Sequence, residues 1–264
     1  MKKTIFAGFL SIVFAVPAAL FAAADTGLTG LQIADRVEAA NVSDKGLVTR
    51  AALELKDLAS QSSEKRDCVM VSLSENGLKK TIFRFTDSSY KDTTFLTLDR
   101  EDKEKTIYIF LKSVGSPRQI ESSDRENNFV DTDFSNEDLG GSNTADYTYT
   151  RLEDKKIDGM DCYFLEKMPK SKTSKYSKYQ MLIDKATNIP VMVKAFNKEG
   201  RLVKTIKMDG VKKIAEEIYV PFSITVVDVD KKHSSVISVK DAAEKAVNKG
   251  YFNKNKMDMK WSEE

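Results

Sequence analysis

The sequence has few of the residues from which catalytic and metal sites are commonly built. Its 264 residues include one histidine, two cysteines and one tryptophan, and 42 Lys and Arg nearly balance 40 Asp and Glu. A Ser-His-Asp triad or a zinc site with several histidines would have to rest on His233 alone. We therefore interpret His233 as a lone surface residue in a turn, and we expect no enzyme activity, metal site or cofactor. The balanced charge also argues against a nucleic-acid partner, which requires a basic excess on one face.

Acidic residues near the middle of the chain do not complete a calcium-binding loop. From Asp131 onward, acidic and serine residues alternate as such a loop begins, but its sixth and twelfth positions, Gly and Glu, are here Asn136 and Ser142. The pattern favours a capped turn instead. Ser135, followed three residues later by Asp138, can form a variant of the capping box at the start of a short helix.

The two cysteines, Cys68 and Cys162, both fall in expected strands that lie far apart in the sequence. An oxidising compartment would permit a disulfide between them. A disulfide requires Cα atoms within about 7 Å, a condition that strands separated by several hairpins rarely meet. The sequence favours two buried thiols that act as small hydrophobic residues.

The first 24 residues have the pattern of a secretory signal peptide. A positive start at Lys2 and Lys3 is followed by an uncharged apolar run over residues 5–16, then by Pro17 and small residues up to Ala24. The run is shorter than the span of about 20 residues that a membrane helix needs, which favours cleavage over anchoring. No cysteine stands near the cleavage point, so we expect an exported chain without a lipid modification.

The mature chain begins with one helix and continues with strands. A helix is expected over residues 28–41, with Thr29 as its N-cap. Its apolar stripe consists of Leu31, Ala34, Val37 and Ala40. Asn76-Gly77 between two alternating runs is a strong hairpin signal, and Asp158-Gly159 marks a second turn. A β pattern begins at Leu47, where Leu53 and Leu55 alternate with polar neighbours. Further strands are expected at residues 68–73, 80–85, 90–98, 106–111, 147–152, 162–166, 179–184, 191–196, 202–208, 218–229 and 234–239.

About a dozen short strands behind one helix predict a mostly β, antiparallel sandwich or barrel formed as a single domain over residues 25–264. Each strand carries apolar residues on one face and polar residues on the other. The apolar face of such a sheet must be covered. If the cover is incomplete or movable, an apolar cavity lies beneath it; the alternation is equally compatible with a solid core.

Residues 115–139 are the most unusual stretch of the chain. They show neither strand alternation nor a helical face, and they are rich in Ser, Asp, Asn and Glu, yet they include Phe129 and Phe134. A loop of this length in a compact chain is usually functional or disordered. Its large apolar side chains indicate that it packs on something, so this stretch and the first helix are the expected covers of the sheet.

This stretch also carries a family resemblance. Its motif resembles the signature of the outer-membrane lipoprotein-sorting proteins, the LolA-like carriers of the bacterial periplasm. The matching residues are Arg118-Gln119-Ile120, Ser123-Asp124-Arg125, Phe129, Thr132-Asp133-Phe134-Ser135 and Glu137-Asp138-Leu139, followed by Asp161-Cys162-Tyr163 and Asn188-Ile189-Pro190 in the expected order. One departure is Asp131, where such relatives usually carry glycine.

The resemblance implies a curved antiparallel half-barrel sheet, covered by the N-terminal helix and by the central loop or helical segment. It implies a soluble periplasmic carrier that shields the acyl chains of lipoproteins or other lipids and hands them towards the outer membrane. A membrane-protein donor or acceptor is a further expected partner. The candidate lipid-binding residues are Phe83, Phe85, Phe129, Phe134, Met181 and Ile183.

A second hypothesis keeps the fold and changes the role. An envelope sensor or interaction module would bind a membrane-protein partner rather than carry lipid. Its contact would be either the lysine-rich loop at residues 170–178 or the tail at residues 257–261. For the lysine-rich loop, a solvated hairpin tip is the simpler interpretation.

Overall fold

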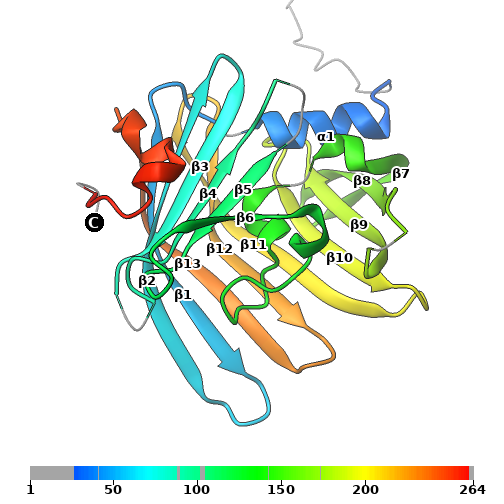
Figure 1. Cartoon of the computed structure of the whole chain (residues 1–264). Helices are drawn as coiled ribbons and strands as arrows, with labels where there is room; N and C mark the ends of the chain where they lie inside the picture. Colours follow the sequence, from blue (N-terminus) through cyan, green and yellow to red (C-terminus); the bar gives the residue numbers. More distant parts are fainter. Residues whose placement is uncertain are drawn as a thin grey trace, which may run out of the picture.

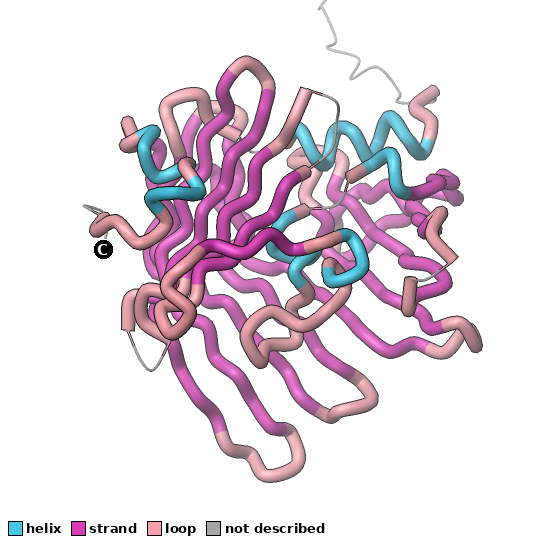
Figure 2. The backbone as a smooth tube through the Cα atoms, viewed as in Figure 1, coloured by secondary structure: helices cyan, strands magenta, loops and turns pink. Residues whose placement is uncertain are grey.

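The computed structural model describes residues 27–40, 42–87, 90–101, 105–141, 143–172 and 174–261, so the expected signal peptide lies outside the described residues. Within these ranges, thirteen strands form one curved antiparallel sheet (Figures 1 and 2). The first six are β1 (Leu47–Asp57), β2 (Ser63–Glu75), β3 (Leu78–Phe85), β4 (Thr94–Leu98), β5 (Thr106–Phe110) and β6 (Pro117–Ile120). The others are β7 (Tyr147–Ile157), β8 (Met160–Pro169), β9 (Tyr176–Asp184), β10 (Pro190–Asn197), β11 (Leu202–Ala215), β12 (Ile218–Asp228) and β13 (His233–Glu244).

The helical elements are short and lie outside the sheet. In the described part of the chain, the two α-helices are α1 (Gly30–Ala39) and α2 (Asn136–Gly140). The 3₁₀ turns are η1 (Ser122–Asp124), η2 (Thr144–Asp146), η3 (Lys249–Phe252) and η4 (Lys254–Lys256).

The sheet consists of two antiparallel meanders, which are joined where β1 pairs with β13. Its strand order is β6-β5-β4-β3-β2-β1-β13-β12-β11-β10-β9-β8-β7, so β1 pairs with β13 at the centre, and β6 and β7 are the two edges. The edges do not pair with each other, and the sheet remains a half-barrel. The expected half-barrel is therefore confirmed, whereas a closed barrel or a two-sheet sandwich is not formed.

The two expected tight turns are present, and their backbone conformations explain the sequence. Asn76 and Gly77 have φ values of 54° and 77°, and Asp158 and Gly159 have φ values of 50° and 84°. Two successive residues with positive φ match the right-handed twist of a hairpin, and Asn, Asp and Gly adopt them most readily. These turns set the register of β2 with β3 and of β7 with β8.

Several strands differ in length from their expected bounds. Strands β7, β11 and β13 continue past the expected ends at residues 152, 208 and 239. Their extensions are rich in charged residues, which carry no hydrophobic alternation but still join the backbone hydrogen-bond ladder. Conversely, β4 begins at Thr94 rather than at residue 90, because Tyr90 lies in a turn.

Between the two edges, the chain crosses the concave face of the sheet. We call residues 121–141, which follow β6 and include η1 and α2, the crossing segment (Figure 1). Phe129 and Phe134 are 1% and 3% exposed. They pack in one cluster with inner-face residues of β1 to β6, β11 and β12. The expectation that the central stretch covers the sheet is confirmed.

Helix α1 covers the concave face over β7 to β9. Thr29 caps it, as expected, through a capping box. Ile33 and Ala34 are buried against β8 and β9, whereas Leu31 is 49% exposed, so the expected stripe is wrong at Leu31. The helix lies close to the sheet at Gly30, where a Cβ atom would come within 2.9 Å of the β7 backbone. Among the described residues, no helix is long and apolar enough to cross a membrane.

The convex face of β1 to β5 is covered by the C-terminal segment, residues 249–261. Met257 and Trp261 are 1% and 2% exposed and pack on apolar side chains of these strands. The Nη2 atom of Arg84 donates to the Met257 carbonyl at 2.7 Å. The expected polar outer face is thus wrong for β2 to β5, where both faces are buried. The tail is a structural cover, and its buried residues are not available as the partner contact considered above.

Both cysteines are free and buried, as the sequence favoured. Cys68 lies in β2 and Cys162 in β8, and six strands separate them in the sheet order. Burial raises the pKa of Cys68 to about 12, so its thiol remains protonated at physiological pH.

We expect Trp261→Ala to lower the free energy of unfolding by about 3–5 kcal/mol, because it leaves a cavity beside Tyr251 and uncovers part of the outer core. Urea denaturation measures this change. Lys260→Ala, at an exposed neighbouring position, is the control and should change stability by less than about 0.5 kcal/mol. Equal stability of both variants would contradict a covering role for the tail.

Candidate functional site

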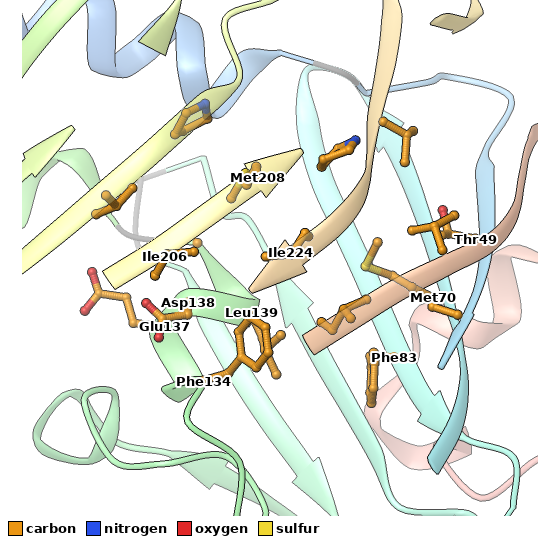
Figure 3. A pocket seen from close by; sticks show the side chains of 18 of the residues that line it. Thr49, Met70, Phe83, Phe134, Glu137, Asp138, Leu139, Ile206, Met208 and Ile224 are labelled. Atoms are coloured by element: carbon orange, nitrogen blue, oxygen red, sulfur yellow. The ribbon is translucent and has the colours of Figure 1, made fainter. Parts of the chain in front are cut away.

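A cavity of about 330 Å³ lies between the concave face of the sheet and the crossing segment (Figure 3). This volume is at the lower end of the range for small-molecule sites, which is about 300–1,000 Å³. The walls are mainly apolar. Labelled apolar residues that line the cavity are Met70, Phe83, Phe134, Leu139, Ile206, Met208 and Ile224.

Strand register brings these walls together. Ile224 of β12 stands opposite Met208 of β11 and opposite Ile237 of β13, and all three side chains face the cavity. Because side chains alternate across a strand, every second residue of these adjacent strands faces inward. Sequence alternation indicated this face, but it could not show that the space above it is only partly filled.

The structure brings some of the candidate lipid-binding residues to the cavity. Phe83 of β3, Met181 of β9 and Phe134 of the crossing segment line it. Phe85 and Phe129 instead pack beside it, with ring centroids 6.0 Å apart.

The sixth candidate, Ile183, lies elsewhere. It is fully buried beneath α1, against Ile33 and Ala34. Its inward direction is the expected one, but the helix occupies the space above it.

Charged residues also line the cavity, among them Lys167, Glu137 and Asp138, and sequence reasoning missed this role. Lys167 of β8 is paired with Glu137 at 3.3 Å, and Lys204 of β11 is paired with Asp138 at 3.0 Å. Burial alone would lower the pKa of Lys204, but the charge of Asp138 and the nearby Tyr176 raise it above its usual value. A lysine at an inward strand position looks like a solvated residue in the sequence, because the segment that covers it is distant in the chain.

Tyrosines surround these pairs. The hydroxyl of Tyr147 donates to the Glu137 carboxylate at 2.5 Å, and the Lys167 ammonium lies 3.7 Å from the centre of the Tyr147 ring. Tyr179 lines the cavity. Burial, together with the charge of Glu137, raises the pKa of Tyr147 and of Tyr179, so both hydroxyls stay protonated.

A second polar contact fixes the crossing segment to the centre of the sheet. The buried carboxylate of Asp133 accepts hydrogen bonds from the Ser235 hydroxyl at 2.8 Å and from His233 Nδ1 at 2.6 Å. The Asp133 amide donates to the Ser235 hydroxyl at 2.9 Å. His233 is therefore not a lone surface residue but an anchor. The serine bonds to the carboxylate and not to the imidazole, which is not the arrangement of a nucleophilic triad.

A third contact holds the tip of the crossing segment. Arg66 donates from Nη1 to the Val130 carbonyl at 2.9 Å and lies 3.7 Å above the Tyr90 ring, whose hydroxyl donates to Asp131 at 2.8 Å. Val130 and Asp131 have φ values of 41° and 60°, a conformation that costs about 1–3 kcal/mol for such residues. Glycine, which the resembling proteins usually carry at the position of Asp131, adopts this conformation without the cost. Here the contacts of Arg66 and Tyr90 offset it.

The lysine-rich loop is attached to neighbouring segments, although its residues Lys170, Lys172 and Lys175 are exposed, as expected of a solvated loop. Lys175 donates its backbone amide to the Glu126 carboxylate at 2.7 Å, and the Lys170 ammonium donates to the Ala145 carbonyl at 2.7 Å. No cluster of three His, Cys, Asp or Glu side chains suited to a metal ion occurs in the described part of the chain.

Several solved structures have the same fold as this chain. A domain from Vibrio parahaemolyticus, named as an outer membrane lipoprotein-sorting protein domain, is 24% identical with a TM-score of 0.77, and the alignment covers 87% of this chain and 98% of that one. A DUF1329 family protein from Desulfovibrio piger is 21% identical with a TM-score of 0.75, covering 86% and 97%. A LolA superfamily protein from Nitrosomonas europaea is 18% identical with a TM-score of 0.65, covering 87% and 99%.

Sequence comparisons are less informative about activity. No curated protein matches the chain. One family model, described as "Uncharacterized protein", matches residues 77–259. Because that match spans more than half of the sequence, and because the structural neighbours share its architecture, the chain belongs to this family and has the LolA-like fold of the outer-membrane lipoprotein-sorting proteins.

Proposed function

We propose that the protein is a periplasmic carrier, exported by a cleaved signal peptide, that shields the acyl chains of a lipoprotein or lipid in the cavity of its half-barrel. The observation that carries this proposal is the apolar cavity of about 330 Å³ beneath a cover that belongs to the same chain. The LolA-like fold is a binding and carrier fold, and it agrees with a role that needs no catalysis.

The energetics of the cavity suit such a role. Burying one methylene group stabilises a complex by about 0.8 kcal/mol, so a chain of about twelve methylenes offers roughly 10 kcal/mol before the costs of ordering it. That is sufficient to keep an acyl chain out of water. Release then requires a membrane or a protein acceptor, in line with the expected handover towards the outer membrane.

The cover has the properties of a part that can move. Phe129 and Phe134 hold it by apolar contacts, and polar contacts at Arg66, His233 and Ser235 fix it at named points. Water can replace each polar contact when the segment lifts, because hydrogen bonds in proteins are exchanged for hydrogen bonds to solvent at a modest net cost. Lifting would enlarge the cavity towards the length of an acyl chain.

Filling the cavity should abolish lipid uptake without unfolding the protein. Ile224→Trp adds a ring to the cavity wall, and excluding even two methylenes of a ligand costs about 1.6 kcal/mol, which weakens the Kd more than tenfold. Native mass spectrometry with lipid extraction, and titration with a fluorescent fatty acid, measure the effect.

The matched control for this experiment is Thr225→Trp, one residue along β12 and on the opposite face. It should leave uptake unchanged. Absence of lipid from the wild-type protein, together with no uptake of the fatty acid, would refute the carrier function. Equal uptake by Ile224→Trp and the wild type would place the ligand outside this cavity.

Loosening the central anchor should speed ligand exchange. Asp133→Ala removes the acceptor of His233 and Ser235, so the crossing segment should lift more often and the release rate of a bound fatty acid should rise several-fold. Stopped-flow release and amide hydrogen exchange at Phe129 measure this. Asp230→Ala, which breaks an exposed pair with Arg201, is the control. Unchanged release and exchange would mean that the segment is not the gate.

The partner-binding alternative has one specific observation in its favour. Leu152, Phe164, Leu182 and Met192 form a continuous row across β7 to β10 on the outer face, and each is partly exposed. An apolar row that is partly exposed is more stable in contact with another protein than in contact with water. Loss of a co-purifying membrane protein in Phe164→Glu, with lipid uptake intact, would favour the sensor or interaction module over the carrier.

A further inference from the structure

One end of the cavity has a charge pattern that the apolar walls do not explain. Lys167 and Lys204 belong to a single row that crosses β8, β9, β10 and β11 on the concave face, with Tyr179 and Ala195 between them in register. Adjacent strands lie about 4.8 Å apart, so the two lysine positions are about 14 Å apart along this row. Their side chains are only 9% and 7% exposed. One buried cation, Lys167, thus lines the apolar cavity, and a second, Lys204, is paired with Asp138, which also lines it.

The negative partners of these lysines come from the cover and not from the sheet. Glu137 and Asp138 are the first-turn acidic residues of α2, and both face the cavity, as Figure 3 shows. The crossing segment as a whole holds seven Asp or Glu residues and one Arg. The sheet therefore supplies fixed positive charge, and the removable cover supplies the negative charge that balances it.

This division of charge constrains what can take the place of the cover. A buried charge that loses its partner is strongly destabilising, because it is neither hydrated nor paired. When α2 lifts, Lys167 and Lys204 lose the carboxylates of Glu137 and Asp138. A ligand with a neutral headgroup brings no counter-charge to these lysines, whereas a carboxylate or phosphate brings negative charge together with hydrogen-bond acceptors.

The tyrosines complete the surroundings of such a headgroup. Tyr147 already donates its hydroxyl to a carboxylate oxygen at 2.5 Å, that of Glu137. The ring of Tyr176 lies 5.9 Å from the Lys204 ammonium. A phenol hydroxyl that stays protonated can donate a hydrogen bond, so it adds affinity for carboxylate or phosphate oxygens.

We propose that the cavity takes an amphiphile with an anionic headgroup, whose carboxylate or phosphate replaces Glu137 and Asp138 beside Lys167 and Lys204 while its acyl chain lies against the apolar wall. This inference rests on the proposed carrier function and adds the chemical class of its ligand. The α2 carboxylates act as an internal substitute for the headgroup in the empty protein.

Three probes with the same acyl chain test the proposal. They are hexadecanoate, the lysophospholipid 1-hexadecanoyl-lysophosphatidate and the neutral 1-hexadecanoylglycerol, each titrated into the lipid-free protein by calorimetry below its aggregation concentration. We expect both anionic probes to bind at least about tenfold more tightly than the neutral one, the scale of a charged hydrogen bond. The tighter of the two anionic probes identifies carboxylate or phosphate as the headgroup.

Charge-neutral double variants locate the effect. Lys167→Met with Glu137→Gln, and Lys204→Met with Asp138→Asn, each remove a whole ion pair, so neither leaves an unpaired buried charge. Each should reduce the preference for anionic probes several-fold with little loss of affinity for the neutral probe.

The matched control is Lys178→Met with Glu166→Gln, a pair 2.8 Å apart on the outer face of the same hairpin. This variant should keep the full preference. Equal binding of all three probes by the wild type, or an equal loss of preference in the control, would overturn the headgroup site and leave the carrier function standing. Failure of every probe to bind would instead overturn the carrier function itself.

Discussion

An open antiparallel sheet with an apolar concave face is unstable in water until something covers that face, and this constraint organises the molecule. The crossing segment supplies most of the cover because the chain must travel from the edge strand β6 to the opposite edge strand β7. Helix α1 covers the remaining end, over β7 to β9. A cover made of one loop cannot match the curvature of many strands at every point, and the cavity is the space that it leaves.

The two faces of the sheet are stabilised in different ways. On the convex side, Met257 and Trp261 pack tightly on β1 to β5. On the concave side, the crossing segment combines aromatic packing with polar contacts at fixed points, among them Asp133 with Ser235 and Arg66 with Val130. The first arrangement suits a permanent core. The second suits a cover that can lift and return to one position, as the proposed carrier function requires.

Charge is also divided between the sheet and the crossing segment. Lysines on the sheet are matched by carboxylates on the crossing segment, so the closed state buries no unpaired charge at Lys167 or Lys204. The strained residues Val130 and Asp131 lie at the tip of the segment, where Arg66 and Tyr90 hold them. Local strain and long-range ion pairing therefore meet in the crossing segment, whose conformation depends on contacts with the sheet as well as on the capping box of α2.

Elements that depend on neighbours in the chain could be predicted from local sequence patterns. Asn76-Gly77 specified a hairpin, Thr29 and Ser135 specified helix caps, and period-two alternation specified the inward faces of most strands. Tertiary structure decided what depends on distant residues. It selected an open half-barrel, exposed Leu31, buried Trp261 on the outer face, and placed Lys167 and Lys204 under carboxylates 30 and 66 residues away. Burial and pairing of this kind arise only when separate segments meet, so no local pattern records them.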